Sequence, residues 1–158
     1  MINVTQILAE PFEQRLERVK QHVPFDGYLF GSRSKISVGP DSDWDFAAKW
    51  SENNHKKLIA AGYHCLGIRQ GYTLMAQETS AYKQQFQYCD QLSVAFYVKE
   101  VEGLSINVVL KNDMELFKKV WERISEQFFV DFIWKQGSFF SGKGHITQVM
   151  DQLFEVAR

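Results

Sequence analysis

The chain has 158 residues, of which 45% are hydrophobic, and its formal net charge is −1. The length suits one domain of ordinary size, and the apolar content excludes a disordered chain. The near-neutral charge excludes a global basic field that would attract nucleic-acid backbones, while a local basic patch stays open.

The N-terminal segment is expected to be helical. Residues 3–9 favour a short turn of helix, and Pro11 suits the first turn of the helix that follows. Apolar residues then recur at helical spacing: Phe12, Leu16, Val19 and Val23. The apolar run 28–30 ends at Gly31, which predicts a buried strand leading into a tight turn.

A strand followed by a capped helix is predicted next. Residues 34–42 contain turn-forming residues and are expected to form a loop, and 43–50 reads as a strand. Ser51 can cap a helix over 52–61, and Gly62 is well placed to end it.

The middle of the chain is rich in strand signals. Residues 63–68 and 72–77 favour strands, whereas the polar stretch 79–88 stays ambiguous. Residues 92–99 and 104–111 are clear β runs joined by a short segment ending in Glu-Gly, which predicts a hairpin.

The C-terminal segment returns to helical spacing. Asn112 and Glu115 resemble a capping box at the start of the first helix. The apolar positions of that helix are Leu116, Phe117, Val120, Trp121 and Ile124. A last amphipathic helix is predicted from Ile146, Val149, Met150, Leu153 and Phe154. We therefore expect a single α/β (α+β) domain over 1–158, a mixed sheet with flanking helices and one covered face.

Cysteine usage and the absence of targeting signals indicate the compartment. Cys65 and Cys89 lack zinc-ligand spacing, which favours free thiols in a reducing environment. The chain begins without a signal-peptide pattern, and no apolar run approaches the length of a membrane span. A cytoplasmic protein with no membrane partner is expected.

Two carboxylates on one strand are the strongest chemical signal. Alternate residues of a strand share a face, so Asp43 and Asp45 should project together while Trp44 and Phe46 pack on the other side. Two such carboxylates repel each other unless a cation lies between them. Their hard oxygen ligands favour Mg²⁺ or Mn²⁺, which also binds substrate phosphates.

A small-residue turn stands before these carboxylates. Gly31 permits close approach of backbone to a phosphate, and the Ser32 hydroxyl can donate to a phosphate oxygen. Arg33 could pair with a phosphate through two hydrogen bonds. A helix starting just after this turn would add N–H donors and a favourable dipole.

Together these residues resemble the DNA polymerase β-like nucleotidyltransferase superfamily. The matching segments are Leu29-Phe30-Gly31-Ser32-Arg33 and Ser42-Asp43-Trp44-Asp45-Phe46. The resemblance is to small bacterial and phage members, and it implies a nucleotidyltransferase core over about 25–111 with a C-terminal helical cap over 112–158.

The resemblance also implies an activity and a role for each matching residue. Gly31 and Ser32 would bind the triphosphate of an NTP, and Asp43 and Asp45 would hold one or two metal ions, Mg²⁺ or Mn²⁺. The enzyme would move an NMP to an acceptor hydroxyl and release pyrophosphate. The near-neutral charge favours a small molecule or a protein as acceptor, and a tRNA end stays open.

Asn107 is the main departure from this pattern. The family places a third catalytic carboxylate on a later strand, where this chain has an amide that cannot accept a proton. The chain is then active without that carboxylate, or takes the third acid from Asp90 or Glu102 at the hairpin ends. Otherwise it is a degenerate module that binds nucleotide or a partner protein without transferring anything.

Other residues carry weaker signals. His64 beside Cys65 is the histidine of most interest, and Lys111 and Lys135 could reach a triphosphate. The segment 137–144 has the composition of a phosphate loop without its spacing. The aromatic C-terminal helices read first as core, and a homodimer or partner surface is the second interpretation.

Overall fold

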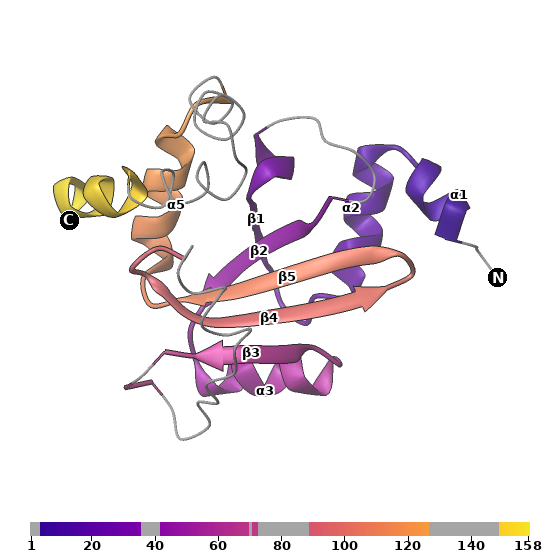
Figure 1. Ribbon diagram of the computed structural model, residues 1–158, viewed down its shortest axis with the longest axis horizontal. Coiled ribbons are helices and arrows are strands. Elements are labelled where there is room, and N and C mark those ends of the chain that lie inside the picture. Colours follow the sequence, from indigo (N-terminus) through magenta and orange to yellow (C-terminus); the bar gives the residue numbers. More distant parts are fainter. Residues whose placement is uncertain (1–3, 36–41, 70, 73–88, 127–148) are drawn as a thin grey trace.

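The computed structural model describes residues 4–35, 42–69, 71–72, 89–126 and 149–158. Within these residues the fold is mixed α/β, built on a five-stranded sheet in the order β1-β2-β5-β4-β3 (Figure 1). The strands are β1 (Tyr28–Phe30), β2 (Trp44–Lys49), β3 (His64–Ile68), β4 (Ser93–Val101) and β5 (Leu104–Lys111). The central pair β2 and β5 is parallel, and every other neighbouring pair is antiparallel.

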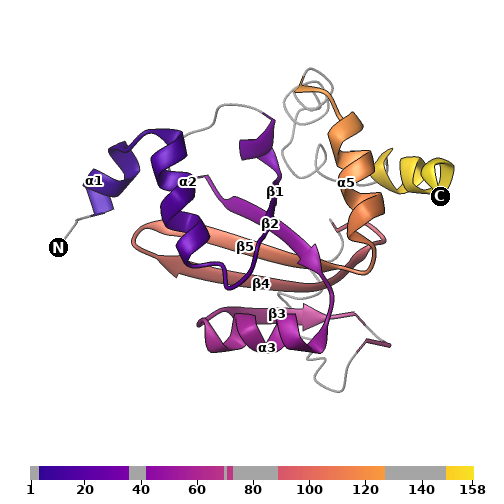
Figure 2. The same cartoon turned by 180° about the vertical axis from the view of Figure 1, so that it is seen from behind.

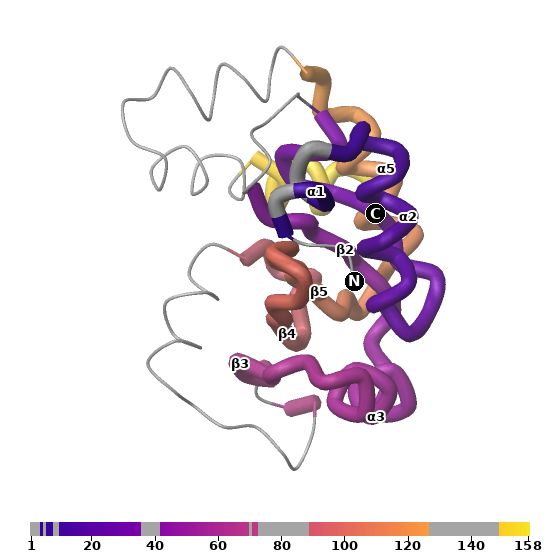
Figure 3. The backbone as a smooth tube through the Cα atoms, turned by 90° about the vertical axis from the view of Figure 1, so that its right-hand side faces the viewer, coloured from indigo at the N-terminus to yellow at the C-terminus, as the bar shows by residue number. Residues whose placement is uncertain are grey.

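Helices lie on both faces of this sheet (Figure 2). They are α1 (Val4–Ala9), α2 (Phe12–Gln21), α3 (Glu52–Ala60), α5 (Met114–Arg123) and a C-terminal helix over 149–157. Helix α3 lies beside β3 in the tube view (Figure 3), and α5 packs together with the C-terminal helix.

The alternation of β2 explains how two cores share one strand. Trp44 and Phe46 are fully buried in a core with Val19 of α2 and Leu58 of α3. Ala47 points the other way, into a second core with α5 and the C-terminal helix. Successive strand residues face opposite sides, so both faces of β2 are covered. The expectation of one covered face was therefore wrong.

Local capping signals place the ends of α3 as predicted. The Ser51 hydroxyl accepts a hydrogen bond from the Asn54 N–H at 2.9 Å, which satisfies one of the orphan donors of the helix. Gly62 follows the last turn with φ +90°, a conformation that residues with a Cβ rarely adopt.

The hairpin and the start of α5 refine the sequence prediction. Glu102 and Gly103 both have positive φ, so they alone form the tight turn and β4 continues to Val101. The cap of α5 is Asp113, whose carboxylate accepts the Leu116 N–H at 3.0 Å. The predicted cap, Asn112, was wrong by one residue because its N–H still bonds to the carbonyl of Leu92.

Several predicted features lie outside the described residues. They are almost all of the strand 72–77, the stretch 79–88, Lys135, the segment 137–144 and the aromatic residues after Glu126. No described helix combines the length and the apolar character that crossing a bilayer requires.

Candidate functional site

The two carboxylates lie at the start of β2. Asp45 is half-buried on the strand and Asp43 is exposed just before it, while Trp44 between them is fully buried in the opposite direction. The two aspartates therefore share one face, as their spacing predicted.

Asn107 completes this cluster from the neighbouring strand. The parallel register of β2 and β5 sets Asp45 directly opposite Asn107. The Asn107 Nδ2 donates to Asp45 Oδ1 at 3.1 Å and lies 3.4 Å from Asp43 Oδ2. The amide therefore bridges two carboxylates that would otherwise repel each other. If the amide group of Asn107 is turned by 180°, Oδ1 takes the place of Nδ2 and can bind a cation held by the two aspartates.

Gly31 lies against this cluster from β1. The last residue of that strand, Phe30, pairs with Asp45, so Gly31 turns directly beside the carboxylate. Its φ is +75° and its ψ is −164°, a region that essentially only glycine occupies. A Cβ built on Gly31 would overlap Asp45 Oδ2. Conformation and space therefore both require glycine here.

Gly31→Ala is expected to damage the site and the fold together. The strained backbone should lower the free energy of unfolding by about 1–3 kcal/mol, and the new methyl group should displace the Asp45 carboxylate. Chemical denaturation and a Mg²⁺ titration of nucleotide binding would measure the two effects.

Gly71→Ala is the matched control. Gly71 has φ +94° and no atom within 4 Å of a built Cβ, so this variant carries the backbone strain without the contact. If nucleotide binding fell equally in both variants, the proximity of Gly31 to Asp45 would have no functional role.

The turn after Gly31 is shorter than a phosphate-binding helix. Residues Ser32–Ser34 form a single 3₁₀ turn, closed by hydrogen bonds from Ser34 and Lys35 to the carbonyls of Gly31 and Ser32. The sequence analysis considered a helix that starts just after this turn, whereas the structure has a single 3₁₀ turn there. Any N–H donors for an anion here come from that turn.

Arg33 holds the chain just before β2. Its guanidinium donates to the carbonyl oxygen of Ser42 at 2.6 Å and to that of Asp43 at 3.2 Å. It also stacks 4.0 Å from the centre of the Trp44 ring. Burial lowers the pKa of Arg33 to about 10, helped by repulsion from Arg15 and opposed by the two aspartates. We therefore assign Arg33 to positioning Asp43, a different role from the phosphate contact that its sequence position suggested.

The alternative third acids lie elsewhere. Asp90 forms a buried ion pair with Lys111, 2.8 Å long, at the far end of β5. Glu102 is in the hairpin turn, 3.6 Å from His22. Lys111 is four residues from Asn107, about 13 Å along β5, and Glu102 is in the turn that precedes the strand. Neither acid joins the cluster, and Lys111, only 2% exposed, is not available to a triphosphate.

His64 and the cysteines contribute no catalytic group to this cluster. His64 is exposed on β3. It pairs with Val98 of β4, which in turn pairs with Asn107 of β5, so His64 is two strands away from Asn107. Neither Cys65 nor Cys89 is in a disulfide. Burial raises the pKa of Cys89 to about 11, and also raises that of Cys65, so both thiols are poor nucleophiles at neutral pH.

A network missed by the sequence reasoning ties the turn to α5. The Trp121 Nε1 donates to Ser34 Oγ at 3.1 Å, and Ser34 Oγ donates to the Gly31 carbonyl at 2.8 Å. Lys35 Nζ donates to the Trp121 carbonyl at 2.9 Å. Trp121 is 86 positions from Lys35 and 87 positions from Ser34, and no sequence spacing predicts such contacts.

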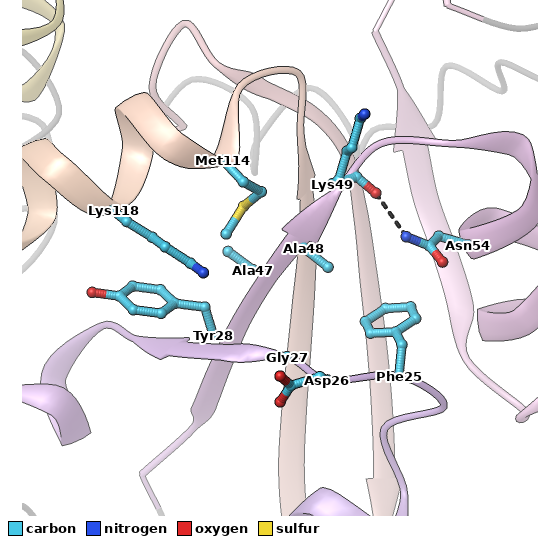
Figure 4. Close-up of a pocket in the computed structure, with 10 residues that line it drawn as sticks. All are labelled: Phe25, Asp26, Gly27, Tyr28, Ala47, Ala48, Lys49, Asn54, Met114 and Lys118. Atoms are coloured by element: carbon cyan, nitrogen blue, oxygen red, sulfur yellow. Dashed lines mark hydrogen bonds between the residues drawn. The ribbon is translucent and has the colours of Figure 1, made fainter.

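A separate pocket of about 370 Å³ lies at the other end of β2. Figure 4 shows Met114 and Lys118 of α5 and Tyr28 of β1 around Ala47. Asn54 Nδ2 closes another side by donating to the Lys49 carbonyl at 2.9 Å. Asp43, Asp45 and Asn107 do not line this pocket. Ala47, which does, is two residues from Asp45 on the same face of β2, about 7 Å along the strand.

The cluster has a donor set that suits a hard divalent cation. Mg²⁺ usually takes one or two carboxylates and completes its shell with water and substrate phosphates. Among the described residues no group of three or more His, Cys, Asp and Glu gathers, so any metal here would rest on Asp43, Asp45 and the Asn107 amide oxygen. Comparisons with family models, curated proteins and solved structures gave no significant match.

Proposed function

We propose that the protein is a metal-dependent nucleotidyltransferase that moves an NMP from an NTP to an acceptor hydroxyl. The observation that carries this proposal is the convergence of Asp43, Asp45 and Asn107 beside the backbone of Gly31. Two carboxylates that suit a divalent metal meet a glycine turn at one point, and this combination suits phosphoryl chemistry.

The chain's own residues would act mainly by positioning. Gly31 lets the backbone turn directly beside the Asp45 carboxylate, and the Ser32 hydroxyl would donate to a phosphate oxygen. Arg33 fixes the backbone of Asp43. A divalent cation held by the aspartates would neutralise charge on the transferring group and on pyrophosphate. The acceptor oxygen forms a bond to the α-phosphorus while the bond to the leaving pyrophosphate breaks.

Asn107 supports a second candidate function, a nucleotide-binding module without turnover. A neutral amide cannot take the proton of the acceptor hydroxyl, and it is a weaker metal ligand than a carboxylate. In that case the cluster would bind the metal and the NTP and present the complex to a partner.

Labelled NTPs separate these two functions. The protein is incubated with each labelled NTP, Mg²⁺ or Mn²⁺ and cell extract, and both NTP binding and label transfer are measured. Transfer that disappears in the Asp43→Ala, Asp45→Ala double variant establishes the enzyme. Metal-dependent binding without transfer establishes the module.

A matched double variant guards against a general charge effect. Glu13→Ala, Glu17→Ala removes the same charge from exposed positions of α2, and it should bind and transfer as the wild type does. If the wild type bound no NTP at all, with either metal, both proposals would be overturned.

A further inference from the structure

A relay of hydrogen bonds connects α5 to Gly31. The Trp121 Nε1 is 3.1 Å from Ser34 Oγ, and Ser34 Oγ is 2.8 Å from the Gly31 carbonyl oxygen. An indole N–H can only donate, so the Ser34 oxygen accepts from Trp121 and the hydroxyl hydrogen is directed at the Gly31 carbonyl. The same carbonyl also accepts the Ser34 N–H at 3.1 Å. Trp121 therefore determines how the Ser34 hydroxyl is oriented, and Ser34 holds the Gly31 carbonyl with two hydrogen bonds.

The Gly31 carbonyl in turn sets the direction of the next peptide group. A peptide bond is planar and trans, so the Ser32 N–H points opposite to the Gly31 carbonyl. Ser32 opens the 3₁₀ turn, where the first N–H groups have no partner within the turn itself. Gly31 has strained φ and ψ values and lies against the Asp45 carboxylate. Backbone in such a conformation persists only where its surroundings hold it, and the relay supplies that support.

Trp121 is itself a firmly packed anchor for this relay. Its side chain is almost fully buried. Its ring stacks on Phe117 with 6.3 Å between ring centres and meets Phe30 edge-on at 5.8 Å. The Trp121 carbonyl accepts from Lys35 Nζ at 2.9 Å. Phe30 directly precedes Gly31 and Lys35 directly follows the 3₁₀ turn, so α5 contacts the turn at both of its ends.

Resting on the proposed function, we propose that Ser34 and Trp121 are positioning residues that hold the Gly31 turn in the orientation that binds the NTP. Neither side chain has to touch the nucleotide, because the Ser34 hydroxyl donates to Gly31 and the Trp121 N–H donates to Ser34. A shift of α5 reaches the turn through these two hydrogen bonds. The helix that follows the last described strand of the sheet thereby controls the backbone beside Asp45.

A double-mutant cycle tests this assignment. Trp121→Phe removes the N–H donor and keeps a ring for Phe30 and Phe117, whereas Ser34→Ala removes the hydroxyl, and a third variant carries both changes. Calorimetry measures the affinity for each Mg²⁺-NTP at a temperature where circular dichroism shows every variant folded, so that lost stability alone does not change the affinity. Each single variant should weaken NTP binding roughly two- to tenfold, which corresponds to one hydrogen bond. The double variant should bind no more weakly than Ser34→Ala, because both changes interrupt one relay.

Trp50→Phe is the matched control. It makes the same chemical change at a half-buried indole whose ring contacts His55 and Tyr72, away from the Gly31 turn, and it should leave the affinity unchanged. If the wild type binds NTP and either single variant binds it equally well, the positioning role is overturned and the proposed function stands. Losses that add in the double variant would also overturn a shared relay. If the wild type binds no NTP, both proposals are overturned.

Discussion

Replacing Asn107 with aspartate is expected to make the protein depend on a divalent metal for its full stability. The variant places a third carboxylate within hydrogen-bonding distance of Asp45 and close to Asp43, where the wild type has a neutral donor. Without metal the three like charges repel each other, and the lost amide bridge adds to the cost. We expect a lower melting temperature in EDTA, and recovery when Mg²⁺ or Mn²⁺ is added.

The same substitution should raise activity if the chain transfers nucleotides. A carboxylate at this position can accept the proton of the acceptor hydroxyl, and positioned general bases contribute roughly 10²–10⁴-fold to rate. Thermal unfolding with and without metal, together with label transfer from NTP, would measure both effects.

Asn112→Asp provides the matched comparison for this variant. It makes the same chemical change just past the other end of β5, where Asn112 is exposed and away from the two aspartates. Its stability should respond little to metal. If Asn107→Asp behaved in the same way, the aspartate pair would not be a metal site.

Lys111→Met should cause the largest loss of stability. The ammonium of Lys111 is 2.8 Å from Asp90 Oδ2 and 2.7 Å from Ser93 Oγ, and both charged side chains are almost fully buried. Removing one partner leaves a buried carboxylate uncompensated, which typically costs about 3–5 kcal/mol. Chemical denaturation followed by circular dichroism would measure the change in unfolding free energy.

Two further variants identify the cause of that loss. In Lys111→Met, Asp90→Asn the unpaired charge is gone, so much of the lost stability should return. Lys49→Met removes a lysine that is the direct register partner of Lys111 yet is exposed, and it should change stability by less than about 0.5 kcal/mol. A double variant as unstable as Lys111→Met would show that packing, and not the buried charge, accounts for the loss.

The sequence predicted the elements whose signals are local. The bounds of β5 agree with the predicted run 104–111. The tight turn before Leu104 marks its first end, and the apolar residues that follow mark its extent. Ser51 and Gly62 located the ends of α3 for the same reason. The α5 cap was misplaced because Asn112 and Asp113 are both good caps, and only the pairing of Asn112 with Leu92 decides between them.

The site was predictable only where strand periodicity governs it. The shared face of Asp43 and Asp45 follows from strand alternation. The expectation that Asn107 lies beside them came from the family resemblance. The roles of Arg33 and Lys111 depend on backbone carbonyls and a carboxylate that fold next to them. Long-range contacts of this kind have no signature in spacing.

The position of β5 has a consequence for how the chain is made. It is the last described strand in sequence, yet it lies between β2 and β4, and it is the only described strand that joins the β1–β2 pair to the β3–β4 pair. A nascent chain that stops before Leu104 has two separate sheet fragments with open edges. Asn107 is in this same strand. The last polar residue of the cluster and the strand that joins the two halves of the described sheet are therefore synthesised together. No earlier intermediate during synthesis can have the complete cluster.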